Sequence, residues 1–515
     1  MVDPVELQIF NNLFSAVGEE MGAVLQRTAF SPNIKERRDF SCALFDRHGR
    51  LIAQAAHIPV HLGSMPLSVK EVVKSLELKE GDMAVLNDPY RGGTHLPDIT
   101  VVAPVYYDGE LLFYVANRAH HADVGGISAG SMPLSTSLFQ EGLIVPPVKG
   151  VVGGEINSDF LELLKRNSRS PVEREGDFKA QVMANRVGIK RLTELLEKYS
   201  PVKVEAMAEA LLDYSERMMR SFIAEIPDGV YTFGDFMEDD GVGGKDFRVR
   251  VVLTVKGEEV KVDFSGSYPQ SRGSINSVRA IALSATLYVF KALAGDDVPS
   301  NEGILRPIEV ITRKGTVVDA EFPAAVSAGN VETSQRLVDV LLGALSKALP
   351  EKIPAASQGT MNNLSFGGKN FAYYETIGGG AGAHPEADGE SAVQTHMTNT
   401  LNTPIEALEL TYPVEVTAYK IRENSGGEGL RRGGNGIVRE ILFKEEVELT
   451  VISERRVHRP YGLQGGLPGK PGRNLLIKEN GEVVELPAKF TITVKPGQKI
   501  RIETPGGGGW GWKKV

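Results

Sequence analysis

The chain has 515 residues, of which 42% are apolar, and it carries a net charge of −9 at pH 7. At roughly 150 residues per domain this allows about three compact units, and bulk stability requires no disulfide or structural metal. The acidic balance, with no Lys/Arg run longer than a pair apart from small clusters such as 35–38, argues against a nucleic-acid partner.

The first predicted element is a helix over residues 4–25. Asp3 is placed to cap its N-terminus, Pro4 occupies the first helical position, and Glu6 completes the spacing of a capping box. Apolar residues then recur along one face with a helical period. The same period predicts further helices at about 65–76, 158–198, 201–224, 276–294 and 331–348.

Strand-like hairpins separate these helices. The segments 40–45 and 50–54 form one hairpin, and an Asn480-Gly481 turn marks another between 475–478 and 482–486. From about residue 411 onward the chain consists of short strands and glycine turns. The predicted fold class is α+β, with a helix-rich N-terminal half that carries β-hairpins and a β-rich C-terminal region.

Two changes in pattern suggest where domains end, near 227–229 and near 404–413. They predict an N-terminal metal-site domain at 1–226, a central α+β domain at 227–404 and a C-terminal β-rich region at 405–515.

The expected compartment is the cytoplasm. Cys42 is the only cysteine, as is typical of a reducing environment. The first residues lack the basic and apolar segments of a signal peptide, and the most apolar stretch, 280–290, is too short to span about 30 Å of hydrocarbon. We therefore expect no membrane-spanning segment.

Three of the nine histidines fall between positions 95 and 121, around a predicted hairpin. The apolar runs 99–106 and 111–116 flank an Asp108-Gly109 turn. A turn centred there pairs residues whose numbers sum to about 217, so that Asp98 faces Ala119 and Pro97 faces His120. Facing Cα atoms in such a pair lie about 4.5–5.5 Å apart.

The hairpin therefore gathers His95, Asp98 and His120 at one end. Two imidazoles and a carboxylate match the ligand set of catalytic zinc, iron or manganese sites that keep a position open for water or substrate. The alternative is that these histidines only form hydrogen bonds at strand ends. Convergence of three ligand-type residues favours a metal.

The hairpin does not fix a fourth ligand. His57 and His61 are four residues apart, but Pro59 between them argues against a helical ligand pair, so we interpret both as loop or core histidines. The candidates are Asp39, Asp88, His57, His61, His121 and Asp123.

Several longer motifs resemble those of the hydantoinase B family, and together they span essentially the whole chain. They are Arg27–Ser41, Asn87–Tyr90, Gly92–Asp98, Asn117–Gly126, Ile377–Gly380 and Thr504–Gly511. This family contains the B subunits of ATP-dependent N-methylhydantoinases and lactamases, the matching half of 5-oxoprolinase, and the alpha subunits of acetone-type carboxylases.

The resemblance implies a divalent metal (Zn, Mn or Fe) held by Asp39, His95, Asp98 and His120. It also implies a hetero-oligomer in which a hydantoinase A-type partner binds ATP-Mg and activates a small cyclic amide such as a hydantoin, 5-oxoproline or a lactam. The Gly-x4-Gly-Lys-Ser/Thr nucleotide motif is absent from this chain. We hypothesise that His121 or Asp123 relays a proton during ring opening.

Two other functions stay open at this point. One is a subunit of an ATP-dependent ketone carboxylase of the acetone or acetophenone type. The other is a partner whose metal is purely structural, which predicts a closed site with four ligands.

Glycine-rich segments at 377–389 and 506–509 allow several interpretations. Backbone N–H groups in the first could bind phosphate, line a substrate tunnel or merely form turns. The second is either a frayed end or a packed tail.

Overall fold

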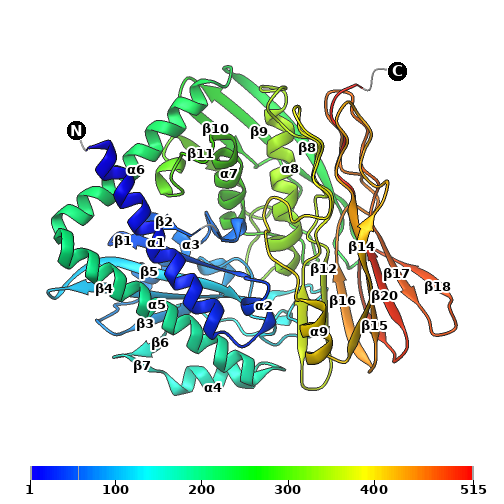
Figure 1. The fold of residues 1–515 in the computed structure, drawn as a ribbon, viewed down its shortest axis with the longest axis horizontal. Helices are drawn as coiled ribbons and strands as arrows, with labels where there is room; N and C mark the ends of the chain where they lie inside the picture. Colours follow the sequence, from blue (N-terminus) through cyan, green and yellow to red (C-terminus); the bar gives the residue numbers. More distant parts are fainter. Residues whose placement is uncertain (1–2, 56, 513–515) are drawn as a thin grey trace.

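The computed structural model describes residues 3–55 and 57–512. It confirms the α+β class, with helices concentrated in the N-terminal half and sheets in every part of the chain (Figure 1). Among the helices in these two ranges, we find none with the length and apolar character needed to cross a membrane.

A seven-stranded sheet forms the base of the N-terminal half, in the order β2-β1-β5-β4-β3-β6-β7. Its strands are β1 (Phe40–Asp46), β2 (Leu51–Gln54), β3 (Met83–Leu86), β4 (Asp98–Tyr107), β5 (Glu110–His120), β6 (Val148–Val152) and β7 (Glu155–Ile156). The predicted hairpin of β1 and β2 is confirmed, since the two strands pair antiparallel.

Helices cover both faces of this sheet. The helices α1 (Pro4–Thr28) and α5 (Pro171–Tyr199) pack on one face (Figure 1). On the other face α3 (Met65–Ser75) contacts β4 and β5. Neighbouring strand residues point to opposite faces, so Val101 joins the core under α5 while Val102 joins the core under α3. Both faces of the sheet are therefore buried, and its central strands are apolar along most of their length.

Most predicted helices are present. Asp3 caps α1 by accepting a hydrogen bond from the Val5 N–H at 3.0 Å. The predicted helix over 158–198 is two helices, because the chain breaks before Pro171, which starts the second one. The remaining helices are α2 (Pro32–Lys35), α4 (Ser158–Arg166), α6 (Pro201–Ala224), α7 (Arg279–Ala294), α8 (Ser334–Leu345) and α9 (Ile405–Thr411).

Three further sheets lie beyond the first. One has the order β11-β10-β9-β8, and the two C-terminal sheets have the orders β13-β12-β16-β19 and β14-β15-β20-β17-β18 (Figure 1). Their strands are β8 (Gly229–Asp239), β9 (Lys245–Lys256), β10 (Glu259–Asp263), β11 (Ile308–Ile311), β12 (Asn363–Gly367), β13 (Ala372–Glu375), β14 (Val414–Arg422), β15 (Gly436–Phe443), β16 (Val447–Ile452), β17 (Arg473–Ile477), β18 (Val483–Leu486), β19 (Lys489–Val494) and β20 (Lys499–Glu503).

The apolar core has one large cluster and smaller ones. The large cluster includes residues from Leu7 to Ile452, and a second, between the C-terminal sheets, includes residues from Leu364 to Ile502. The division into domains at 226 and 404 stays a prediction.

Glycine-rich segments pack against one another without regular strand structure, mainly through the backbone. We call the segments 379–389, 425–436, 462–469 and 505–511 the glycine layer (Figure 1, yellow to red). Gly434 donates its N–H to Ala381 at 2.8 Å and accepts from Gly507 at 2.9 Å. A Cβ atom on Gly434 would lie 1.9 Å from the Glu390 carbonyl oxygen. The C-terminal glycines thus form a packed tail, buried in this layer.

Candidate metal centre

The hairpin of β4 and β5 brings the predicted ligands together. Asp108 and Gly109 both have positive φ, 50° and 80°, as the predicted two-residue turn requires. The predicted register is wrong by one residue, because an irregularity between Val105 and Tyr106 adds a residue to one strand. Asp98 consequently pairs directly with His120 instead of Ala119.

The side chains of His95, Asp98 and His120 converge on one point. His95 Nε2 lies 3.3 Å from Asp98 Oδ2, and His120 Nδ1 lies 3.4 Å from Asp98 Oδ1. One ligand atom from each of the three residues falls within 4.8 Å of the others, and all three side chains are buried. The arrangement gathers a potential metal-ligand set away from solvent.

These residues fit a divalent cation. Among the residues that the structure describes, Asp98 Oδ1 finds no hydrogen-bond partner, although it is buried and faces His120 Nδ1. Buried polar atoms normally have partners, so this oxygen is a candidate for ion binding. Metal bonds of about 2.0–2.1 Å place tetrahedral ligand atoms about 3.3 Å apart, which matches the spacing around Asp98.

His61 belongs to the same cluster. It ends a short 3-10 turn, Pro59–His61, and its Nε2 lies 3.4 Å from Asp98 Oδ2. Its Nδ1 is 2.9 Å from the Ser41 hydroxyl, which fixes the ring orientation. The interpretation of His61 as a loop or core histidine is therefore incomplete: it is buried, but it faces the cluster. Pro59 rules out an α-helical pair with His57 but starts the tight turn that brings His61 inward.

Asp39 lies beside the cluster, immediately before β1. Its backbone carbonyl accepts the N–H of His120 at 3.0 Å, and its carboxylate is 3.8 Å from the buried Arg37 guanidinium. Asp39, Asp98 and His120 all line one small cavity of about 20 Å³. A volume of this size holds about one water molecule or ion.

The charge states suit metal binding. Burial alone would raise the pKa of Asp98, but the imidazoles of His95, His61 and His120 outweigh it and hold this pKa well below its usual range. Burial lowers the pKa of His120 and outweighs the opposite effect of Asp98. An ionised carboxylate and a neutral imidazole are the forms that coordinate a metal.

Residues far away in the sequence complete the cavity wall, and two of them contact the histidines. Asn330 lies on a π-helical turn, Gly329–Thr333, and its Nδ2 is 3.0 Å from His95 Nε2. Its Oδ1 is buried without a hydrogen-bond partner among the described residues. The Tyr374 ring stacks on His120 with centroids 4.5 Å apart. Sequence reasoning missed both, because no local pattern links positions more than 200 residues apart.

The two residues expected to relay a proton contact other parts of the fold. His121 Nε2 lies 2.9 Å from the Gln181 side chain on α5. Asp123 accepts hydrogen bonds from the backbone N–H groups of Gly125, Gly130 and Arg169, and pairs with the Arg169 guanidinium at 2.9 Å. The structure thus places His120 in the cluster and His121 against α5.

Comparisons with known proteins confirm the predicted family resemblance. The model of the hydantoinase B/oxoprolinase family matches residues 3–513. The 5-oxoprolinase of Dictyostelium discoideum is 40% identical over 522 residues, which cover 99% of this chain and 40% of that longer protein.

Two solved structures share the fold. The ATP-dependent caprolactamase of Pseudomonas jessenii has a TM-score of 0.93 at 30% identity, covering 99% of this chain and 91% of the caprolactamase chain. A nucleotide-free acetone carboxylase has a TM-score of 0.90 at 18% identity, covering 99% and 76%. The second likeness shows the fold alone.

Proposed function

The chain belongs to the hydantoinase B/oxoprolinase family, and from this premise we propose that it is the metal-bearing subunit of an ATP-dependent hydrolase that opens the C–N bond of a cyclic amide. The observation that carries the proposal is the buried cluster of His95, Asp98 and His120, in which Asp98 Oδ1 has no hydrogen-bond partner among the described residues. The 5-oxoprolinase and caprolactamase relatives are both named for cyclic amides, which supports this substrate class.

We assign the metal to Asp39, His95, Asp98 and His120, with His61 adjoining Asp98. A divalent cation bound there would act as a Lewis acid and lower the pKa of water beside the substrate. The nitrogen and oxygen donors suit Zn²⁺, Mn²⁺ or Fe²⁺. Around them, Arg37 pairs with Asp39, Ser41 orients His61 and Tyr374 covers the ring of His120.

We assign ATP to an A-type partner subunit, because this chain lacks the common nucleotide motif and spans only 40% of the length of the 5-oxoprolinase it matches. Phosphoryl transfer from ATP to the amide oxygen gives ADP and an O-phosphorylated ring. Addition of one water molecule and cleavage of the ring C–N bond then give an open-chain amine that carries an acyl phosphate, and a second water molecule hydrolyses the acyl phosphate to the carboxylate and inorganic phosphate. Activation is needed because unactivated amides hydrolyse over very high barriers.

The buried Asn330 amide contacts His95 Nε2 at 3.0 Å, and we propose that it orients the substrate or its water. Relay of a proton through His121 or Asp123 stays a prediction, as does a cytoplasmic location. The contacts of His121 with Gln181 and of Asp123 with Arg169 mean that either relay needs an intermediate group.

The test is to co-express this chain with its A-type subunit, measure bound metal, and follow ATP consumption with hydantoin, 5-oxoproline, a lactam, or acetone plus bicarbonate. We expect His95→Ala to lower both bound metal and ring opening by about 100-fold or more, because a ligand contributes at least as much as its supporting residues. His48→Ala, which changes an exposed histidine, is the matched control.

A His95→Ala variant with unchanged metal content and turnover would refute the proposal. Stimulation of ATP use only by a ketone with bicarbonate would establish the carboxylase alternative. That alternative now has weaker support, since the likeness to acetone carboxylase shows the fold alone.

A further inference from the structure

The metal cavity is too small for the substrate that it would act on. Its volume of about 20 Å³ has room for one water-sized particle, whereas sites for small organic ligands measure about 300 Å³ or more. The ring of a cyclic amide must therefore occupy space next to the cavity.

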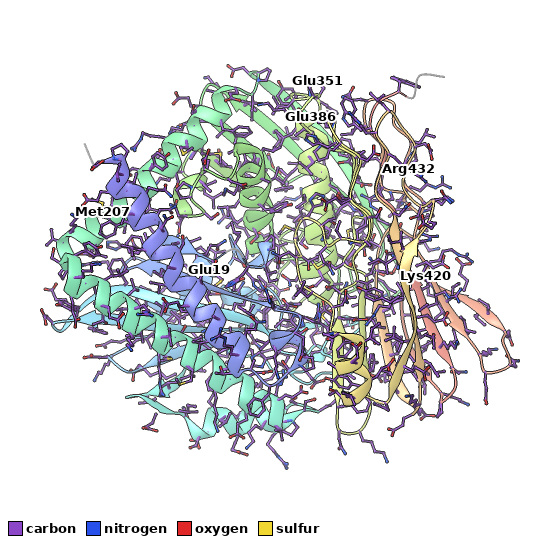
Figure 2. All side chains as sticks on the ribbon, viewed as in Figure 1. Glu19, Met207, Glu351, Glu386, Lys420 and Arg432 are labelled. Carbon is purple, nitrogen blue, oxygen red and sulfur yellow. The ribbon has the colours of Figure 1, made fainter. Side chains whose placement is uncertain are left out.

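One recess in the surface adjoins the cavity directly, and we call it the inner recess. Its volume is about 290 Å³. Its lining is Glu19, Gly22, Ala23, Gln26, Arg38, Phe40, His57, Asn399 and Leu401. Glu19 lies on the exposed side of α1 (Figure 2).

The inner recess and the metal cavity share their walls. Arg38 and Phe40 flank Asp39, which lines the cavity. In the same way His57 precedes Ile58, and Asn399 follows Thr398. Three short segments therefore present one residue to the recess and the next to the cavity.

The inner recess offers a cation and a hydrogen-bond donor. Arg38 is exposed and makes no ion pair or side-chain hydrogen bond with the described residues; its φ of 56° is in the left-handed region, which is rare outside glycine. The Nδ1 atom of His57 accepts the Cys42 N–H at 3.1 Å, so the neutral ring carries its hydrogen on Nε2. Burial, with smaller effects of His61 and Arg38, lowers the pKa of His57 to about 4 and keeps that ring neutral.

The position of the His57 ring also depends on a glycine of α1. A Cβ atom on Gly22 of α1 would lie only 2.8 Å from His57 Nε2. Because Gly22 has no side chain, it leaves room for the Cε1–Nε2 edge of the His57 ring.

The recess continues outward into a wider bay of about 510 Å³ that also contains Gln26, Arg38 and Leu401. Across the two, the basic residues are Arg27, Lys35 and Arg38, and the acidic ones are Glu19 and Glu36. This local excess of positive charge contrasts with the net charge of −9 of the whole chain. A recess of this kind attracts anions.

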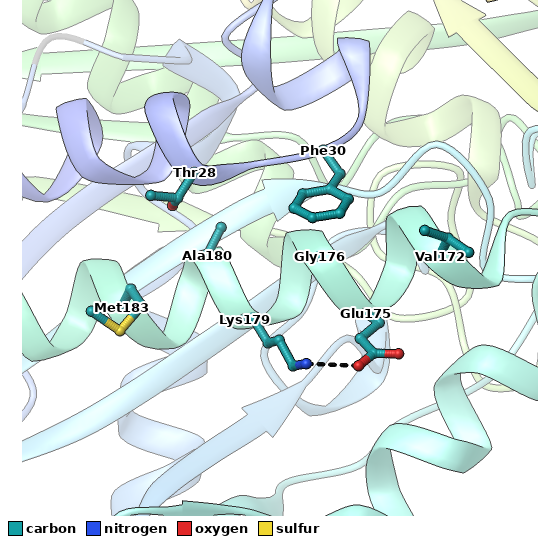
Figure 3. A pocket seen from close by; sticks show the side chains of 8 residues that line it. All are labelled: Thr28, Phe30, Val172, Glu175, Gly176, Lys179, Ala180 and Met183. Atoms are coloured by element: carbon teal, nitrogen blue, oxygen red, sulfur yellow. Dashed lines mark hydrogen bonds and ion pairs between the residues drawn. The ribbon is translucent and has the colours of Figure 1, made fainter.

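A larger recess elsewhere has neither an unpaired cation among the described residues that line it nor a residue in common with the metal cavity. It lies between the end of α1 and α5, has a volume of about 350 Å³, and is lined mainly by apolar side chains such as Phe30, Val172 and Met183 (Figure 3). Its one cation, Lys179, pairs with Glu175 at 2.7 Å. It shares no residue with the metal cavity.

We propose that the inner recess binds the phosphoryl group of the activated cyclic amide, with Arg38 as its counter-charge and the Nε2–H of His57 as a hydrogen-bond donor, and thereby holds the ring against the metal cavity. This inference rests on the proposed function, which supplies the O-phosphorylated ring. Inorganic phosphate, the product of that reaction, is the appropriate probe.

The experiment measures phosphate binding to the full chain by calorimetry, first without metal and then after loading with Mn²⁺. In the loaded chain, ³¹P relaxation reports how close phosphate lies to the metal. We expect Arg38→Ala to weaken phosphate binding about tenfold and to reduce the ³¹P relaxation at a fixed phosphate concentration, because a charge-assisted pair is lost. Arg38→Lys should retain part of the affinity, since lysine keeps the charge without the planar fork.

Lys190→Ala is the matched control, because it removes an exposed cation on α5 far from the recess lining in the sequence and should leave phosphate binding unchanged. Equal phosphate affinity in the wild type and in Arg38→Ala would overturn the inference, whatever the metal content. Failure to take up Mn²⁺ would instead count against the proposed function, and calorimetry without metal would still decide the role of Arg38.

Discussion

The candidate metal cluster and the glycine layer are built in opposite ways. The cluster depends on which side chains are present: the buried imidazoles of His61, His95 and His120 surround the carboxylate of Asp98. The glycine layer depends on side chains being absent, because at most of its glycines another backbone segment occupies the place of a Cβ atom. Chemistry and packing thus impose different demands on two parts of one chain.

The two regions also differ in the effect that amino-acid substitutions should have. In the cluster a change of side chain alters charge or ligand geometry while the backbone of β4 and β5 remains paired. At most glycines of the layer even a methyl group would collide with a backbone carbonyl group of a neighbouring segment. We therefore expect substitutions in the layer to act on folding and those in the cluster to act on metal binding.

The largest effect should come from Gly434→Ala. The new methyl group would sit 1.9 Å from the Glu390 carbonyl oxygen, so the backbones must separate, at a cost on the order of 4 kcal/mol or more in the free energy of unfolding. Chemical denaturation measures it. The control is Gly481→Ala, a position with φ of 84° and open space, which should cost only about 1 kcal/mol of backbone strain. Equal losses in the two variants would contradict a packed glycine layer.

A smaller effect concerns His121, next to the cluster. Burial, with the nearby Arg174 second, lowers its pKa to about 3 in the folded protein, whereas the unfolded chain has the ordinary value near 6.5. Below pH 6.5 the unfolded chain therefore binds a proton that the folded protein does not, and stability is lost as the pH falls.

Between pH 7 and pH 5 this should cost the wild type about 2 kcal/mol that His121→Gln does not lose. Urea unfolding of both proteins at the two pH values provides the measurement. Identical losses would show that the folded protein accepts the proton on His121.

The smallest effect should follow Ser41→Ala. Its hydroxyl lies 2.9 Å from His61 Nδ1, so its removal frees the His61 ring, and metal affinity should fall about tenfold while the fold stays intact. Competition with a chelator gives the affinity, and Ser75→Ala, an exposed serine on α3, is the control. An unchanged metal affinity would show that His61 is not part of the metal site, which would then consist of His95, Asp98 and His120.

Local signals made much of the N-terminal half predictable. The Asp3 cap, the helical period and the Asp108-Gly109 turn each depend on neighbouring residues, and each is present. The family resemblance, carried by long motifs, is also confirmed, by a match over residues 3–513. The register error arose from an extra residue near Tyr106, which turn geometry alone does not reveal.

Features that depend on distant contacts were not predictable. His61 was set aside because its approach to Asp98 depends on how the turn at Pro59 docks on the sheet. Nothing near Asn330 or Tyr374 in the sequence indicates that they meet His95 and His120. The glycine segments were open to several interpretations, since their partners are other glycines far along the chain.

The cavity wall has a consequence for biosynthesis. The histidines and Asp98 lie within residues 61–120, whereas Asn330, Tyr374 and Met397 close over them. Because a ribosome adds about 5–20 residues per second, the ligand hairpin emerges on the order of 10–40 s before Asn330. A nascent chain thus exposes the proposed ligands during translation, and on the proposed function the metal ions present in that interval would compete for them before the cavity closes.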